Sequence, residues 1–373
     1  MPVNRVNNFT SLILNHLYAA QNASGNIAIR GISLYALFGA ISVGLEGTSY
    51  QQLSNFLGVG FEELFDLENW RKSDSANDWF MMRYLGEKSS RMNTAVFSPY
   101  DTYNIYQSLT KLICRLDHIQ FDHFEPYDSV EKMNNWTYQR SYGWIKNMFP
   151  RSILGEDRMI FFDTSFIDAD FVTEFDAAYT QREMFYDEQG EVYEVDMMNQ
   201  ENYERIYDSR DDIFRILFKP LARSYLFSAI VLPKMWYIVD HVLRTLDFDK
   251  INNYFKRSSM KYAKLKLPKF QIVSQNNFNN LFKDFGVTDI FDEYKSNFRR
   301  MINKNVHVGD IIQVTNIIVD DKNDTGISTE SLGEQPIQHL HKFFVTRPFI
   351  FLVYSPFDRL VHFSAVVENP TSI

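Results

Sequence analysis

The feature that most constrains this fold is a change of hydrophobic period along one uninterrupted chain. In the first half, apolar residues recur at helical spacing, as in residues 33–45 and 130–140. In the second half, strand-like patterns take over, as in the alternating run 262–273 and the apolar run 306–320. Because no linker, repeat or low-complexity tract separates the halves, we predict a single α+β domain over residues 1–373.

Two polar stretches interrupt this pattern. Residues 71–92 are polar and broken, and we expect loops and turns there. Residues 321–341 lie between the run 306–320 and the strand-like run 343–367. A patternless stretch of this length inside a compact domain is usually functional or disordered, so it is a candidate functional loop.

Charge and hydropathy argue against two classes of partner. The formal net charge is −9, whereas a nucleic-acid footprint needs a basic patch. No apolar run reaches the roughly 20 residues of a membrane span. The chain also lacks His-Glu-x-x-His and Gly-x-Ser-x-Gly motifs, so we expect no enzymatic activity, no catalytic residues, no cofactor and no metal site.

Cysteine usage and sequons bear on the compartment. The single Cys114 cannot form an intramolecular disulfide, and its apolar helical surroundings favour a buried hydrophobe over a reactive thiol. Four glycosylation candidates occur, at Asn8, Asn22, Asn135 and Asn323. We expect a secreted protein whose signal peptide has been removed, since the N-terminus has no apolar signal core; a cytoplasmic protein is the alternative.

Several segments resemble serpin signatures in the right order along the chain. They are Asn26-Ile27 with the following ISLYALFGAISVGLEGTSYQQL, Met133-Asn134-Asn135-Trp136, Phe166–Phe175, Val195-Asp196-Met197-Met198, Leu267-Pro268-Lys269-Phe270, Arg347-Pro348-Phe349-Ile350-Phe351 and Val367-Glu368-Asn369-Pro370. Together they span roughly residues 9–370, and the chain is identified as a member of the serpin family. The resemblance implies three β-sheets, about nine helices and an exposed reactive-centre loop.

In inhibitory serpins that loop is a bait. A protease cleaves it, the loop inserts into the main sheet as a new strand, and the acylated protease is distorted. The polar stretch 321–341 falls where the loop should be. Asp321 precedes Pro348 by 27 positions (348 − 321), which fits the usual spacing and places the scissile bond between Ile337 and Gln338.

The loop hinge departs from the inhibitory pattern Glu-Glu-Gly-Thr-Glu-Ala-Ala-Ala-Ala-Thr. The matching hinge residues here are Asp321, Lys322, Asn323, Asp324, Thr325, Gly326, Ile327 and Ser328, followed by Thr329 and Glu330. An inserted strand buries alternate side chains, and by the resemblance that set includes Asp324 and Glu330. Because burying an unpaired carboxylate costs several kcal/mol, we expect a loop that does not readily insert.

A second region agrees with this expectation. In the cluster that opens for insertion, called the shutter, the family's Ser-Pro-x-Ser becomes Arg30-Gly31-Ile32-Ser33. Its Asn becomes Asp163 and its His becomes Gln313, and the family's Trp at the top of the sheet is Phe171. We hypothesise that Arg30 and Asp163 form a buried ion pair that holds the sheet closed.

The leading hypothesis is a monomeric, serpin-fold binding or regulatory protein without protease inhibition, acting on an unknown protein partner. One alternative is an inhibitor of a serine or cysteine protease, cleaved after Ile337 by an elastase-like enzyme. Another is a carrier or storage protein with the same fold.

Overall fold

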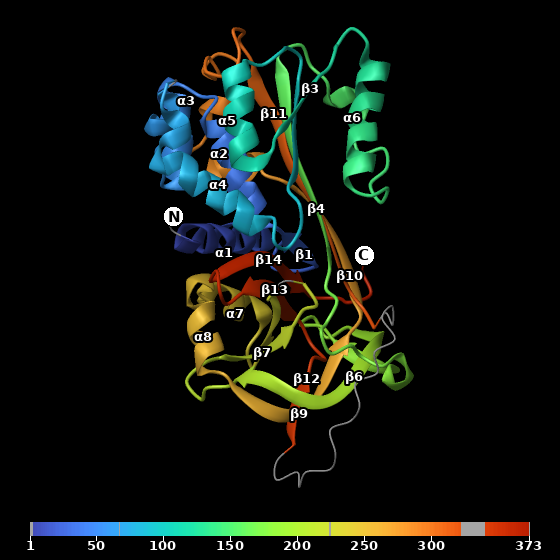
Figure 1. Cartoon of the computed structure of the whole chain (residues 1–373). Coiled ribbons are helices and arrows are strands. Elements are labelled where there is room, and N and C mark those ends of the chain that lie inside the picture. Colours follow the sequence, from blue (N-terminus) through green and yellow to red (C-terminus); the bar gives the residue numbers. More distant parts are fainter. Residues whose placement is uncertain (1–2, 67, 224, 322–339, 373) are drawn as a thin grey trace. The chain divides into compact units, whose positions relative to one another are not determined.

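The computed structural model describes residues 3–66, 68–223, 225–321 and 340–372 (Figure 1). These residues form nine α-helices and fourteen strands, which group into two compact units. The first unit comprises residues 1–5, 32–166 and 275–315, and the second comprises residues 6–31, 167–274 and 316–373. Each unit draws on three separate stretches of chain, and the prediction of one domain stays a prediction.

The first unit holds most of the helices. Its elements are α2 (Gly31–Ser42), α3 (Gly47–Leu57), α4 (Asp74–Gly86), α5 (Asn104–Cys114), α6 (Pro126–Arg140), α9 (Asn279–Asp284), β2 (Asn93–Ser98), β3 (Asp117–Gln120) and the first parts of β4 (Arg158–Asp168) and β11 (His307–Val319). Helix α2 is buried over its whole length, which explains its largely apolar sequence. Gly39 permits this, because a Cβ there would lie 2.5 Å from the ring of Trp79.

Helix α6 covers one face of the sheet within this unit, as the resemblance implies. Trp136 meets Phe97 of β2 edge to face at 5.9 Å, and it meets Phe162 of β4 at 6.1 Å. Met133 of the same helix is fully buried in this cluster. This aromatic packing fixes α6 on the sheet.

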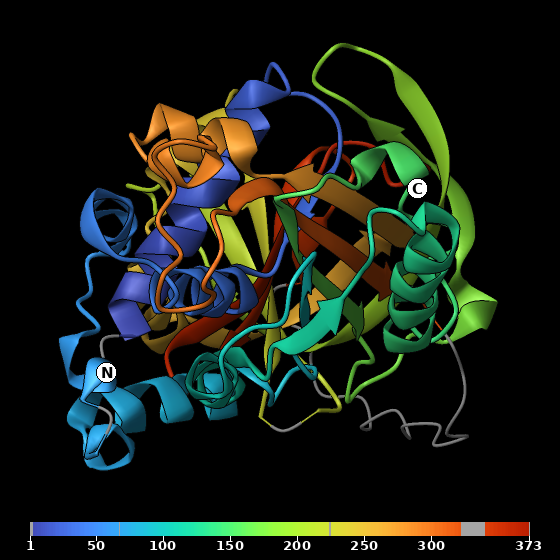
Figure 2. The ribbon, with the colours of Figure 1, turned by 90° about the horizontal axis from the view of Figure 1, so that it is seen from above.

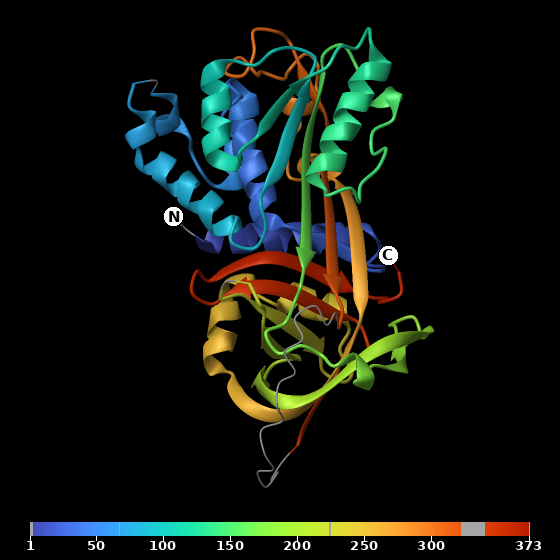
Figure 3. The same ribbon diagram turned by 45° about the vertical axis from the view of Figure 1, so that its right-hand side comes forward.

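Most strands belong to the second unit. Its elements are most of α1 (Val3–Ala20), α7 (Val239–Thr245), α8 (Ile251–Arg257), β1 (Ile27–Ile29), β5 (Gln181–Tyr186), β6 (Val192–Tyr207), β7 (Phe214–Pro220), β8 (Phe227–Pro233), β9 (Ser259–Pro268), most of β10 (Phe270–Asn277), β12 (His341–Phe344), β13 (Phe349–Ser355) and β14 (Leu360–Val367). Helix α1 runs beside β14 (Figure 3), where the side-chain amide of Asn7 donates to the carbonyl of Arg359 at 2.8 Å.

The described strands form two hydrogen-bonded sheets where three were expected. The larger has nine strands in the order β1-β14-β13-β8-β7-β6-β9-β12, with β5 paired to β6. Strand β6 joins two groups of strands into one sheet, because it pairs with β7 at one end and with β9 along most of its length. Its long curved course is visible in Figure 2. The smaller sheet has the order β10-β11-β4-β2-β3.

Some sequence-based boundaries were wrong. Residues 71–92 contain helix α4, whose N-cap Ser73 accepts a hydrogen bond from the Ala76 amide. The helical spacing of its buried residues was masked in the sequence by the exposed apolar residues Phe80 and Met81. The run 262–273 is likewise two strands, β9 and β10, which end and begin around Lys269 and join different sheets.

Candidate functional site

Strand β11 ends shortly before the predicted loop region, so its neighbours determine where that region could add a strand. On one side lies β4, which runs parallel to β11. The amide of His307 donates to the carbonyl of Asp157 at one end of the pair, at 2.9 Å. The amide of Ala169 donates to the carbonyl of Ile318 at the other end, at 3.0 Å. The two strands are direct neighbours in the sheet.

On the other side lies β10, which runs antiparallel to β11. The Gln271 amide group donates to Asn316 Oδ1 at 3.1 Å, and the Phe278 amide donates to the carbonyl of Ile311 at 2.9 Å. A segment that folds back from Asp321 beside β11 can therefore pair antiparallel on both sides only between β4 and β11. Antiparallel pairing is slightly more stable per residue than parallel pairing. An added strand would therefore be favoured between β4 and β11, after these two strands had separated.

Buried polar residues of the predicted shutter occupy that place. Gln313 of β11 donates through Nε2 to Asp163 Oδ2 of β4 at 2.6 Å. Ser33 of α2 donates to the same carboxylate oxygen at 2.8 Å, and Gln313 also contacts Ser33 Oγ at 3.3 Å. All three residues have no solvent exposure. Hydrogen bonds to a charged acceptor are the strong ones, so this network ties β4 to β11.

The structure therefore brings three of the four predicted shutter residues together. Arg30 is fully buried but belongs to the second unit, whereas Asp163 belongs to the first. The predicted ion pair between them stays a prediction.

The first hinge residue is anchored by two side chains of the second unit. Lys269 Nζ contacts Asp321 Oδ1 at 2.5 Å, and Thr180 Oγ1 donates to Asp321 Oδ2 at 2.6 Å. Burial alone would raise the pKa of Asp321, but these two contacts outweigh it and hold that pKa below its ordinary value. The predicted hinge thus begins at Asp321, whose carboxylate is held by two side chains. The sequence motif contained Lys269 but gave no indication that it contacts Asp321.

This anchor predicts a pH-dependent stability difference. Lys269→Met is expected to lower the free energy of unfolding at neutral pH by about 1–2 kcal/mol, because a partly exposed charged hydrogen bond is lost. Since the pKa of Asp321 is depressed in the folded state, its stabilisation is present above pH 3.8 and is lost as the pH falls below that value. Urea unfolding at neutral pH and at about pH 3 should show the difference shrinking in acid. The exposed pair Lys264–Glu201 supplies the control Lys264→Met, which should change little at either pH.

A fully buried charge pair was not anticipated from the sequence. Lys219 of β7 contacts Glu204 Oε1 of β6 at 2.9 Å and donates to Gln200 Oε1 at 2.5 Å. Its ammonium group also lies 5.4 Å from the ring centre of Phe171 and 5.1 Å from that of Phe175. Phe171, which stands where the family has Trp, thus packs around a buried lysine. The sequence signal is a lysine inside the apolar run Ile216–Leu221.

The remaining predicted site residues have simple outcomes. Two groups of predicted site residues lie outside the described residues: the hinge positions 322–328, which include the glycosylation candidate Asn323, and the scissile pair Ile337 and Gln338. Asn8, Asn22 and Asn135 are exposed. Cys114 is fully buried, and burial raises the pKa of its thiol to about 12, as expected for an unreactive cysteine. No helix within the described residues has the length and apolar character to cross a bilayer.

The sequence model described as "Serpin (serine protease inhibitor)" matches residues 4–370. The chain belongs to the serpin family.

Curated relatives match most of the chain, and a solved structure shares its fold. Mouse Serpin A12 is 23% identical over 361 residues, covering 95% of this chain and 84% of that protein. Mouse antithrombin-III is 21% identical over 388 residues, covering 97% and 80%. The crystal structure of native protease nexin-1 with heparin superposes with a TM-score of 0.84 at 18% identity, covering 99% of both chains. The predicted serpin fold is confirmed, and the family consists of protease inhibitors rather than enzymes.

Proposed function

We propose that this protein is a serpin that binds or regulates a protein partner without inhibiting proteases by loop insertion. The observation that carries the proposal is the Gln313–Asp163 hydrogen bond between β11 and β4. An inserting strand would have to break this bond and leave a buried carboxylate without one of its donors. That cost is on the order of 2–3 kcal/mol, and it falls on the step that opens the sheet.

The hinge sequence supports the same proposal. Asp324 and Glu330 alternate with outward-facing positions in the inserted arrangement that the family resemblance implies. Each would take a carboxylate into the sheet interior, which is costly unless a cation accompanies it. An inserted loop in this protein would therefore gain less free energy than the alanine-rich hinge of an inhibitory serpin.

The test is thermal unfolding before and after a protease cuts the loop between Asp321 and His341. We expect the midpoint of the cut protein to stay within a few degrees of the intact one, because the sheet stays closed. The matched control is the triple variant Asp324→Ala/Glu330→Ala/Asp163→Asn, which removes the proposed obstacles. Its midpoint should rise on cutting by about 10 °C or more, which is the shift that several kcal/mol would produce.

The competing function is inhibition with cleavage after Ile337. It predicts a large rise in midpoint for the wild-type protein and an SDS-stable complex with an elastase-like protease. Either result would overturn the proposal. A carrier role stays a third prediction, and a ligand retained through gentle purification would favour it.

We also propose that the protein is secreted and acts as a monomer. The exposed sequon asparagines Asn8, Asn22 and Asn135 support secretion. A mass decrease on glycosidase treatment of the protein from its native source would support this part of the proposal, and an unglycosylated cytoplasmic protein would contradict it.

A further inference from the structure

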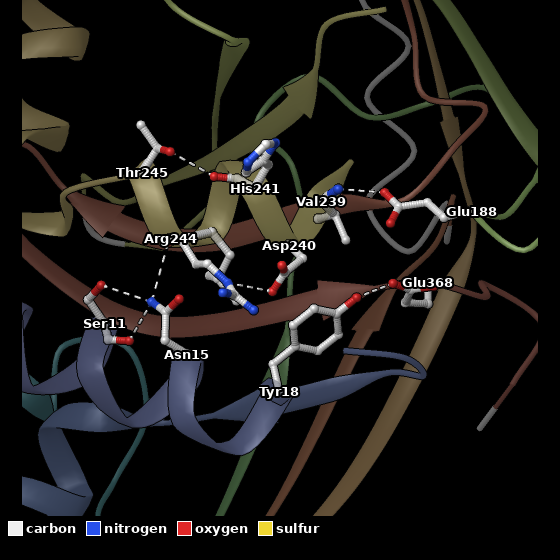
Figure 4. Close-up of polar contacts among 11 residues, drawn as sticks. Ser11, Asn15, Tyr18, Glu188, Val239, Asp240, His241, Arg244, Thr245 and Glu368 are labelled. Carbon is white, nitrogen blue, oxygen red and sulfur yellow. Dashed lines mark hydrogen bonds and ion pairs between the residues drawn. The ribbon is translucent and has the colours of Figure 1, made fainter. Parts of the chain in front are cut away.

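A buried hydrogen bond joins helix α1 to the end of strand β14. The Tyr18 hydroxyl donates to Glu368 Oε1, and Figure 4 shows the two side chains meeting between their elements. Tyr18 has no solvent exposure and Glu368 has 3%. Glu368 is therefore a carboxyl group held inside the protein with a neutral hydrogen-bond donor.

Further acidic groups surround this bond. Glu188, in the turn between β5 and β6, accepts a hydrogen bond from the Val239 amide of α7 at 2.5 Å (Figure 4). Asp187 of the same turn accepts one from Tyr193 of β6 at 3.0 Å. The negative charges of Glu188 and Asp187 disfavour ionisation of Glu368 and so contribute to raising its pKa.

Helix α7 contributes charged groups of both signs. The charge of Asp240 contributes to raising the pKa of Tyr18 and of Glu188. Arg244 pairs with Asp240 at 3.0 Å. His241 lies on the same helix, with its ring centre 6.4 Å from that of Tyr237. Arg244 thus pairs with Asp240, whereas Glu368 and Glu188 accept their hydrogen bonds from neutral donors, the Tyr18 hydroxyl and the Val239 amide.

The hairpin that carries this turn also contacts both described ends of the reactive-loop region. Directly before β5, Thr180 donates to Asp321 at 2.6 Å. At the other end of β5, the Tyr186 amide donates to the carbonyl of Thr346 at 2.9 Å. Strand β5 therefore bridges the residue that opens the loop region and a residue that follows it.

We propose that the β5–β6 hairpin is a pH-sensitive clasp, in which ionisation of Glu368 loosens the turn Asp187–Glu191 and with it the contact between β5 and Thr346. When Glu368 is protonated, it carries no charge that could repel Glu188 or Asp187. When Glu368 ionises, its charge adds to those of Glu188, Asp187 and Asp240 in a poorly solvated place. Like charges in such surroundings repel strongly, so the turn loosens. This clasp does not depend on whether the loop inserts.

The direction of the effect follows from linkage. Burial first, and then the charges of Glu188 and Asp187, raise the pKa of Glu368 to about 7, although the Tyr18 hydroxyl lowers it. In an opened turn the charges of Glu188 and Asp187 move away from Glu368, so its pKa falls toward the ordinary 4.5. The closed turn therefore binds the proton more tightly and loses stability as the pH rises from 4.5 through 7.

The test is amide hydrogen exchange of residues 181–192, expressed as protection factors at about pH 5.5 and about pH 8 to remove the intrinsic pH effect. In the wild-type protein, protection of the turn and of the Tyr186 amide should fall on the order of tenfold between these pH values. Glu368→Gln keeps the size and hydrogen bonding of the protonated side chain, so its protection should not change with pH. Glu191→Gln alters an exposed carboxyl of the same turn and should keep the wild-type fall.

A second variant guards against misfolding of the first. Tyr18→Phe removes the donor that lowers the pKa of Glu368, so loosening should move to higher pH while the fall itself remains. Equal protection of residues 181–192 at both pH values in the wild type would overturn the proposal. A Glu368→Gln protein with the full wild-type fall would overturn it too, because another group would then be responsible.

Discussion

Replacing Gln313 by leucine is expected to lower the free energy of unfolding by about 2–3 kcal/mol. The substitution removes the donor that reaches Asp163 at 2.6 Å from the neighbouring strand. Asp163 has no solvent exposure, so water cannot replace the lost hydrogen bond. Chemical denaturation at neutral pH measures the loss as a shift of the midpoint with an unchanged slope.

Two comparisons make this prediction specific. Gln271→Leu on β10 removes a hydrogen bond to the neutral Asn316 at a partly buried site, and it should cost less than about 1 kcal/mol. Ser33→Ala removes the other donor to Asp163 and should cost about 1–2 kcal/mol, because Gln313 remains. If Gln313→Leu costs no more than Gln271→Leu, the bond does not hold β4 to β11, and the proposed obstacle to insertion disappears.

Replacing Lys219 by methionine should have the larger effect, a loss of about 3–5 kcal/mol. The side chains of Lys219 and Glu204 are 1% and 4% exposed, so the substitution leaves a carboxylate buried without its cation. Burial lowers the pKa of Lys219, while Glu204 acts to keep it charged. The measurement is again equilibrium unfolding, combined with Glu204→Leu to complete a double-mutant cycle.

The cycle separates a pair from two independent residues. Glu204→Leu alone should also be costly, since it leaves Lys219 buried with Gln200 as its remaining polar partner. The double variant Lys219→Met/Glu204→Leu should recover most of either loss, because an apolar pair of similar volume suits this site. Additive losses in the double variant would show that the two residues do not act as a pair.

How far the sequence predicted the structure depended on whether the signal was local. The helices around residues 33–45 and 130–140 were found because their apolar residues recur at helical spacing. Helix α4 was missed because exposed Phe80 and Met81 hide the spacing of the residues it buries. The described strands form two hydrogen-bonded sheets where three were expected, because strand β6 pairs with partners far away in the sequence and periodicity does not report pairing.

The candidate site divides in the same way. The resemblance placed Ser33, Asp163 and Gln313 in one cluster, and hydrogen bonds join these three side chains in the structure. It gave Lys269 no role, and it did not single out Lys219, Glu188 or Tyr18. These side chains acquire their partners only when strands distant in sequence lie side by side.

The sequence by itself determined the family and the order of the main elements, and it predicts the position and length of the loop region. These follow from local period, from short motifs and from residue counts, which do not depend on how distant segments meet. Only the tertiary structure decided which charges are buried and what each of them touches, from Asp321 on Lys269 to Glu368 on Tyr18. The physical reason is that burial and hydrogen bonding depend on distances in space, and those are set when the whole chain packs.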